Sequence, residues 1–247
     1  KITMNDLLRK LPIGIQTFEK LRKGDYLYVD KTELVWKIAY TSTPYFLSRP
    51  RRFGKSLLLS TFEAYFEGKK ELFEGLAIEK LETKWEKHPV LHLDLNAEKY
   101  DSPERLYDIL SRQLTLWEIQ YGKGIDENTL SGRFSGVILT GVTKFSQVSV
   151  FSDLNQLQDI TLWPDYGTLC GITLQELLDT FQPEIKILAA NNSISYDDAV
   201  QRMTRLYDGY HFCINSVGIF NPFSVLNVLK SKVFDNYWFQ TGTPTFL

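Results

Sequence analysis

Residues 45–60 read YFLSRPRRFGKSLLLS, and this stretch decides the predicted fold. Its first four residues, Tyr45–Ser48, form a short apolar run bounded by prolines, which is typical of a buried strand. From Gly54 onward, leucines and aromatic residues recur at helical spacing until Gly68. A strand, a polar loop and a helix in this order predict one unit of an α/β protein.

The loop between the predicted strand and helix ends in Gly54-Lys55-Ser56, as does the phosphate-binding motif G-x-x-x-x-G-K-[ST]. In that motif, backbone N–H groups and the helix dipole bind the phosphates, the lysine reaches the β- and γ-phosphates, and the hydroxyl holds Mg²⁺. Here Arg49 stands where the first glycine is expected, and Pro50 stiffens the start of the loop. We therefore predict a site for ATP and Mg²⁺; the alternative is a solvated basic turn that contacts nucleic acid.

The predicted cofactor-binding residues form one continuous run. They are Arg49, Pro50, Arg51, Arg52, Phe53, Gly54, Lys55, Ser56 and Leu57. Lys55 is also a candidate catalytic residue that steadies the charge developing on the γ-phosphate, and Ser56 is the candidate Mg²⁺ ligand. Lys144 follows the predicted strand GVILTG and is a second catalytic candidate, with a surface lysine as the alternative.

The rest of the chain alternates further predicted strands and helices. PVLHLDLN (89–96) alternates leucines with polar residues and predicts a strand, whereas SPERLYDILSRQLTLWEIQYG (102–122) predicts a helix. Capping-box patterns pair Asp30 with Glu33, Thr173 with Glu176 and Ser195 with Asp198. We expect an α/β fold with a P-loop NTPase-like parallel sheet flanked by helices. Residues 1–167 would form this core, with an N-terminal helical lead, and residues 168–247 a mainly helical C-terminal lid.

Composition restricts the function classes further. The 247 residues include 28 basic and 30 acidic side chains, so the net charge of −2 gives no overall attraction to nucleic acid or to acidic membranes. The chain has no apolar run long enough to cross a bilayer and no secretory leader, which predicts a cytoplasmic protein without a membrane partner. Its two cysteines and three histidines match no metal-binding spacing.

Four stretches together resemble one known family, the AAA-ATPase-like proteins common in gut Bacteroidetes. They are LPIGIQTFEKLRKGDYLYVDKTEL (11–34), YFLSRPRRFGKSLLLSTFEAYFEGKKELFEGLAI (45–78), LTGVTKFSQVSVFSDLNQLQDIT (139–161) and, near the C-terminus, YDGYHF with NPFSVLNVL. The family's own loop has the same R-P-R-R-F-G-K-S form. The resemblance implies ATP binding, and it implies a possible nuclease domain of the PD-(D/E)XK type C-terminal to this chain.

One family feature has no counterpart in this chain. The family places an acidic strand between the helix ending near Tyr121 and LTGVTKF, where this chain has only GKGIDENTLSGRFSGVI. That strand would supply the aspartate that organises Mg²⁺ and the glutamate that activates water. Asp94 is the one substitute we consider, with a strand-end cap as its alternative role. Three functions stay open: an ATPase that regulates a nuclease or other partner, a non-hydrolysing nucleotide sensor, and a nucleic-acid-binding module.

Overall fold

The computed structural model describes residues 10–41, 43–93, 102–122, 138–141, 157–213 and 215–237. The α-helices are α1 (Phe18–Lys23), α2 (Thr32–Tyr40), α3 (Lys55–Phe66), α4 (Pro103–Tyr121), α5 (Leu174–Asn191), α6 (Tyr196–Tyr207) and α7 (Pro222–Ser231). The strands are β1 (Tyr45–Ser48), β2 (Ile138–Gly141), β3 (Gln158–Asp159), β4 (Ile172–Thr173) and β5 (Ile219–Phe220). Short 3-10 helices are η2 (Lys70–Phe73), η3 (Ala77–Lys80) and η5 (Pro164–Tyr166). None of the helices in these ranges is long and apolar enough to span a bilayer.

A small parallel sheet forms the centre of the α/β part. Its strand order is β2-β1-β3, with Tyr45 opposite Ile138 on one side and Gln158 on the other. Tyr45, Phe46 and Leu47 of β1 are all buried, as expected for a central parallel strand covered on both faces. The predicted strands at 45–48 and in GVILTG are therefore confirmed, and the fold is α/β.

The predicted helix starts and stops are largely confirmed, because capping is a local property of the sequence. Ser102 accepts a hydrogen bond from the Arg105 amide at the start of α4, and Gly122 ends that helix. Thr173 and Glu176 make both hydrogen bonds of a capping box at the start of α5. Ser195 caps α6 through the Asp198 amide.

The expected capping box of Asp30 with Glu33 is wrong. Helix α2 begins at Thr32, and its N-cap residue, Lys31, makes no side-chain cap hydrogen bond. The Asp30 carboxylate instead accepts hydrogen bonds from the Thr32 amide at 2.8 Å and from the Ala77 amide at 2.7 Å. Glu33 pairs with Lys37 on the helix surface. One Asp30 oxygen thus bonds Thr32 at the start of the helix, and the other bonds Ala77, in a segment distant in sequence.

The strand predicted at 89–96 is not formed over its described part, residues 89–93. Val90 and Leu91 are only half-buried, and Leu93 is exposed. Alternation of leucines predicts a strand only where a neighbouring strand supplies hydrogen bonds and an apolar surface, and the described sheet offers residues 89–93 neither. Residues 94–96 lie outside the described ranges.

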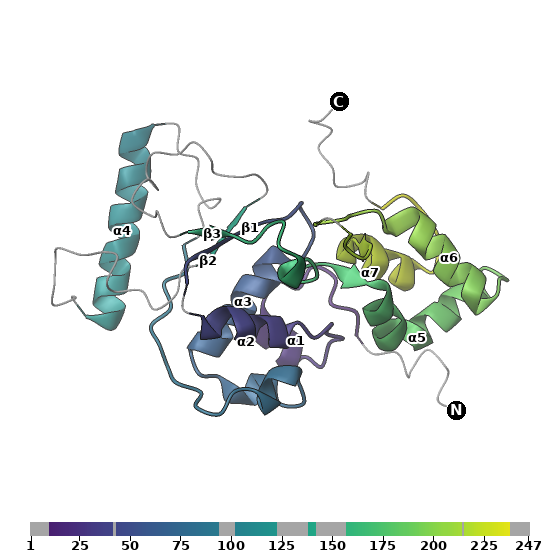
Figure 1. Cartoon of the computed structure of the whole chain (residues 1–247), viewed down its shortest axis with the longest axis horizontal. Coiled ribbons are helices and arrows are strands. Elements are labelled where there is room, and N and C mark those ends of the chain that lie inside the picture. The colour runs from purple at the N-terminus through teal and green to yellow at the C-terminus, as the bar shows by residue number, and fades with distance from the viewer. Residues whose placement is uncertain are drawn as a thin grey trace.

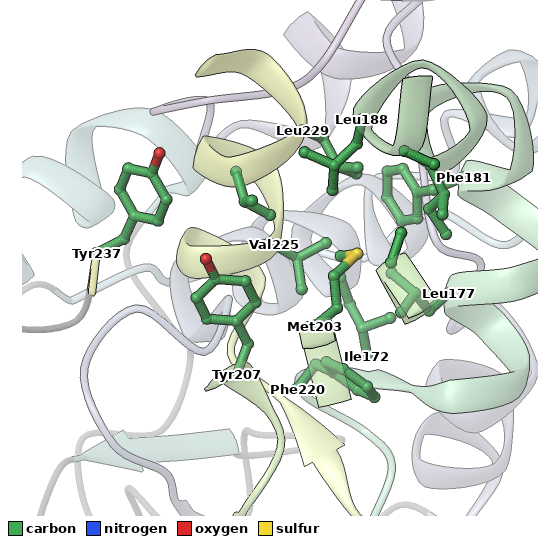
Figure 2. Close-up of a cluster of buried hydrophobic side chains, with 14 of the residues drawn as sticks. Ile172, Leu177, Phe181, Leu188, Met203, Tyr207, Phe220, Val225, Leu229 and Tyr237 are labelled. Carbon is green, nitrogen blue, oxygen red and sulfur yellow. The ribbon is translucent and has the colours of Figure 1, made fainter. Parts of the chain in front are cut away.

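The C-terminal helices enclose their own apolar cluster. Helices α5, α6 and α7 lie together at one end of the molecule, opposite α4 (Figure 1). Their buried side chains surround Met203, as Figure 2 shows, and Leu27 from the N-terminal part packs into the same cluster. A second cluster joins Tyr45 and Leu58 to Phe212 and Ile219. Residues on both sides of position 168 therefore share buried apolar surface.

Candidate functional site

The candidate site is the loop of residues 49–54, which connects β1 to α3. It leaves the carboxyl end of the central strand and leads into the N-terminus of a twelve-residue helix (Figure 1). In parallel α/β sheets, ligands bind at the carboxyl ends of the strands, and a helix N-terminus there favours anions. The expected strand, loop and helix are therefore in place around this segment.

Two residues of the loop adopt left-handed backbone conformations. Gly54 has φ of 88° and Arg52 has φ of 68°. A Cβ atom on Gly54 would meet nothing within 4 Å, so the glycine is favoured by its φ angle and not by crowding. Gly54 is also the N-cap residue of α3 and provides no side-chain cap. No capping side chain therefore covers the first amides of the helix, which suits a phosphate oxygen as their acceptor.

The Lys55 side chain folds back over the loop. Its ammonium group donates hydrogen bonds to the carbonyl oxygens of Arg49 at 2.7 Å and Pro50 at 2.8 Å. Burial lowers the pKa of Lys55, and the positive charges of Arg49 and Arg51 lower it further. A bound polyphosphate would supply the negative charge that this ammonium group lacks in the free loop.

Arg49, the residue at the position of the missing glycine, is directed into the protein. Its side chain is only 1% exposed. The guanidinium donates to the backbone carbonyls of Ser48 and Thr161, both at 2.8 Å, and of Tyr166 at 2.9 Å. It also lies 4.2 Å from the centre of the Phe212 ring. Burial lowers its pKa. The Arg49 side chain is therefore not among the cations on the exposed face of the loop, and the prediction that Arg49 binds the cofactor stays a prediction.

The other predicted residues divide between the surface and the core. The side chains of Arg51, Arg52 and Ser56 are exposed, and the Arg52 guanidinium lies 5.1 Å from the centre of the Phe223 ring at the start of α7. Pro50 and Leu57 are half-buried. Phe53 is buried and packs edge-on against Tyr210. Of this run, Arg51, Arg52, Lys55 and Ser56 have the side chains that are available to a ligand.

Several residues that support the loop could not be assigned to it from the sequence. The Thr161 hydroxyl accepts a hydrogen bond from the Ser48 amide at 3.0 Å, and the Asp159 carboxylate holds the Thr161 amide at 3.0 Å. Asp159 ends β3 and Thr161 lies just after it, more than one hundred positions after the loop, and no motif links them to it. Phe212 lies in YDGYHF, a stretch that resembles the family, but nothing in that stretch assigns it to the loop. The one available signal was the stretch 139–161, which resembles the family and contains both Asp159 and Thr161.

The structure does not place the other candidate residues beside the loop. Lys144 and Asp94 lie outside the described ranges. Within the described ranges, no group of three or more His, Cys, Asp or Glu side chains is arranged to hold a metal ion. His92 instead lies 3.4 Å from a Glu63 carboxylate oxygen, on the exposed side of α3. Among the described residues, the loop therefore remains the candidate site.

Comparison with known proteins agrees with this interpretation. The profile of the AAA-ATPase-like family, described as predicted AAA-ATPase, matches residues 12–151. A curated relative, "Uncharacterized protein in vnfD 5'region" from Azotobacter chroococcum mcd 1, is 32% identical over 300 residues. That match covers 97% of this chain and 55% of the relative, so the chain spans about half the relative's length. Because the aligned region is longer than the 247 residues of this chain, the relative carries segments within it that this chain lacks.

No solved structure gives a significant match. The family profile covers the nucleotide-type loop and more than half of the chain, and this protein belongs to the predicted AAA-ATPase family.

Proposed function

We propose that this chain is an ATP-binding P-loop module. The observation that carries the proposal is the Lys55 ammonium group, which is held at the mouth of the loop by two carbonyl oxygens, at the start of a helix whose first amides have no side-chain cap. A cation and a row of amide donors at one point favour a polyphosphate over other anions. Membership of the predicted AAA-ATPase family supports the same ligand class and the use of Mg²⁺.

In this proposal each loop residue has a distinct task. Backbone amides of residues 53–57 bind the β-phosphate, and the Lys55 ammonium moves from the loop carbonyls toward the β- and γ-phosphates. The exposed Ser56 hydroxyl is available as a Mg²⁺ ligand, and the metal ion would neutralise charge on the β- and γ-phosphates. Arg51 and Arg52 add positive charge on the solvent side.

We propose hydrolysis only for a chain that contains an acidic strand. The described residues provide no cluster of carboxylates beside the loop that is suited to a metal ion. The relative carries segments that this chain lacks, and such a segment is a natural source of the acidic residues. A chain without that strand would act as a nucleotide sensor that binds ATP without hydrolysing it. Comparison of phosphate release by this chain and by the relative tests this assignment: equal rates would contradict it.

The C-terminal helices fit the role of a lid whose state depends on nucleotide. In our proposal residues 168–247 form this lid, and the module regulates a further domain or partner, with the nuclease domain implied by the family resemblance as the first candidate. The chain spans about half of its relative, which leaves room for such a domain in proteins of this family. A nuclease assay on the full-length relative, with and without ATP, tests the regulatory role.

Isothermal titration calorimetry with MgATP tests nucleotide binding directly. We expect saturable binding to the wild-type chain and a loss of at least about tenfold in affinity for Lys55→Ala, because charge-assisted hydrogen bonds of this kind contribute about 1.5–3 kcal/mol each. Lys80→Ala, which removes an exposed lysine from η3, is the matched control and should bind like the wild type. Unchanged affinity in Lys55→Ala would end the proposal.

A DNA-binding measurement separates nucleotide binding from nucleic-acid binding. If the exposed arginines served nucleic acid, affinity for a DNA duplex would fall steeply with salt and would be unaffected by saturating MgATP. Competition between ATP and DNA, or the absence of DNA binding, supports the nucleotide site instead.

A further inference from the structure

Arg49 connects the loop to two segments that are remote in the sequence. Its guanidinium donates to the carbonyl of Thr161, just after β3, and to that of Tyr166, in η5. The same group lies over the ring of Phe212, which precedes β5 in the C-terminal part. The backbone carbonyl of Arg49 accepts one of the two loop hydrogen bonds of Lys55. Arg49 therefore contacts the Lys55 ammonium group through its backbone carbonyl and the C-terminal part through its guanidinium.

The loop has a second contact with the same region. Phe53, four positions after Arg49, packs edge-on against Phe212 with ring centres 5.3 Å apart, and against Tyr210 at 4.6 Å. Both ends of the loop thus rest on the segment 210–212. A movement of this segment would displace the loop carbonyl that holds Lys55, because packed side chains cannot separate without losing their contacts.

Fold stability alone does not explain an arginine at this position. Burying a charged group costs free energy unless all its polar atoms are satisfied, and an apolar side chain of similar size often serves stability as well or better. The Arg49 Nε atom is buried and has no hydrogen-bond partner among the described residues. What the arginine provides instead is a rigid fork that reaches carbonyls in two separate segments at once.

We propose that Arg49 is a positioning residue that couples the nucleotide loop to the segments 161–166 and 210–212, so that occupation of the loop and packing of the C-terminal part stabilise each other. The proposal rests on the proposed function for the identity of the ligand, MgATP, but the coupling itself is a property of the protein. Coupling between two sites is reciprocal, so a partner that pulls the segment 210–212 away would weaken nucleotide binding by the same factor.

Hydrogen–deuterium exchange of the whole chain tests the coupling without any nucleotide. Two variants cut the connection from opposite ends: Arg49→Met removes the guanidinium, and Phe212→Leu changes its C-terminal contact while remaining apolar. We expect Phe212→Leu to speed amide exchange in residues 49–56, and Arg49→Met to speed exchange in 161–170 and 208–213. Arg51→Met removes an exposed loop cation and should change neither remote segment. Exchange that changes only at the mutated segment in both variants would overturn the proposal.

Addition of saturating MgATP provides the second arm of the experiment. In the wild type we expect protection in the loop and also in 161–170 and 208–213. In Arg49→Met the loop protection should persist while the remote protection disappears.

We expect about tenfold weaker MgATP binding for Arg49→Met and for Phe212→Leu, with a double variant little weaker than either single one. Additive losses in the double variant would contradict coupling. Failure of the wild type to bind MgATP would refute the proposed function, and the nucleotide-free arm would still decide the coupling.

Discussion

At the scale of single residues, Lys55 makes the loop sensitive to pH. Burial, together with the charges of Arg49 and Arg51, lowers its pKa from the usual value of 10.5, so the free loop loses its ammonium group at a lower pH than an exposed lysine does. Only the protonated form attracts phosphate. We therefore expect MgATP affinity to fall as the pH rises past the lowered pKa of Lys55 in the free loop.

The sign of this dependence follows from linkage. Bound polyphosphate raises the pKa of Lys55, so binding takes up a proton once the pH exceeds the pKa of the free loop, and alkaline conditions oppose it. Calorimetry between about pH 7 and 10 measures the effect. Lys55→Arg keeps its charge throughout this range and is the control that should show a nearly flat profile. The same slope in both proteins would assign the titration to another group.

Substitution of Gly54 tests whether the left-handed backbone conformation of this single residue matters for stability and binding. Its φ of 88° is unfavourable for any residue with a Cβ atom, although the space around it is open. We expect Gly54→Ala to cost about 1 kcal/mol of unfolding free energy and to lower the melting temperature by about 2–4 °C.

Gly75 is a matched control, because it has φ of 76° and equally open surroundings far from the loop in sequence. Gly75→Ala should cost a similar amount of stability and leave MgATP affinity unchanged, whereas Gly54→Ala should also weaken binding by disturbing the loop amides. Equal affinities in the two variants would show that the conformation of Gly54 does not matter for the ligand.

At the scale of secondary-structure elements, the start of α5 is fixed by more than its own cap. Glu176 completes the capping box through one carboxylate oxygen and pairs with Lys31 at 2.5 Å through the other. The Lys31 side chain is only 10% exposed, and burial lowers its pKa while Glu176 opposes the shift. This ion pair joins the segment before α2 to the C-terminal helices.

Glu176→Gln should therefore destabilise the protein, because glutamine keeps an oxygen for the cap but leaves the buried ammonium unpaired. We expect a loss of about 2 kcal/mol at pH 7, below the value for a fully buried pair because Glu176 is 27% exposed. Chemical denaturation measures it. Glu33→Gln, which breaks the exposed pair with Lys37, is the control and should cost less than about 0.5 kcal/mol. Similar losses in both variants would mean that burial of Lys31 is unimportant.

At the scale of the whole molecule, the shared apolar cluster predicts that the two parts unfold together. Tyr45 and Leu58 from the sheet region pack in one cluster with Phe212 and Ile219 from the C-terminal part. We expect a single calorimetric transition.

MgATP at about one hundred times its dissociation constant should stabilise the fold by about 2.7 kcal/mol and raise the melting temperature by about 5–10 °C. Lys55→Ala should show the same single transition with little shift, and two transitions of which only one responds to MgATP would contradict the prediction.

The sequence by itself determined the local features of this protein. Tyr45–Ser48 as a buried strand, the helix that follows Gly54, and the caps of Ser102, Thr173 and Ser195 were all predictable, because each depends on residues within a few positions of one another. The loop was recognisable as a nucleotide-type motif for the same reason.

Only the tertiary structure decided which of the loop's charges face a ligand. Arg49 and Arg51 are both basic residues of one short loop, yet only Arg49 is buried, where it contacts the carbonyls of Thr161 and Tyr166 and the ring of Phe212. Arg51 is exposed. The strand expected at 89–96 failed over its described residues for a related reason. A strand and a buried charge both need partners that are distant in the chain, and a local pattern carries no information about whether those partners are present.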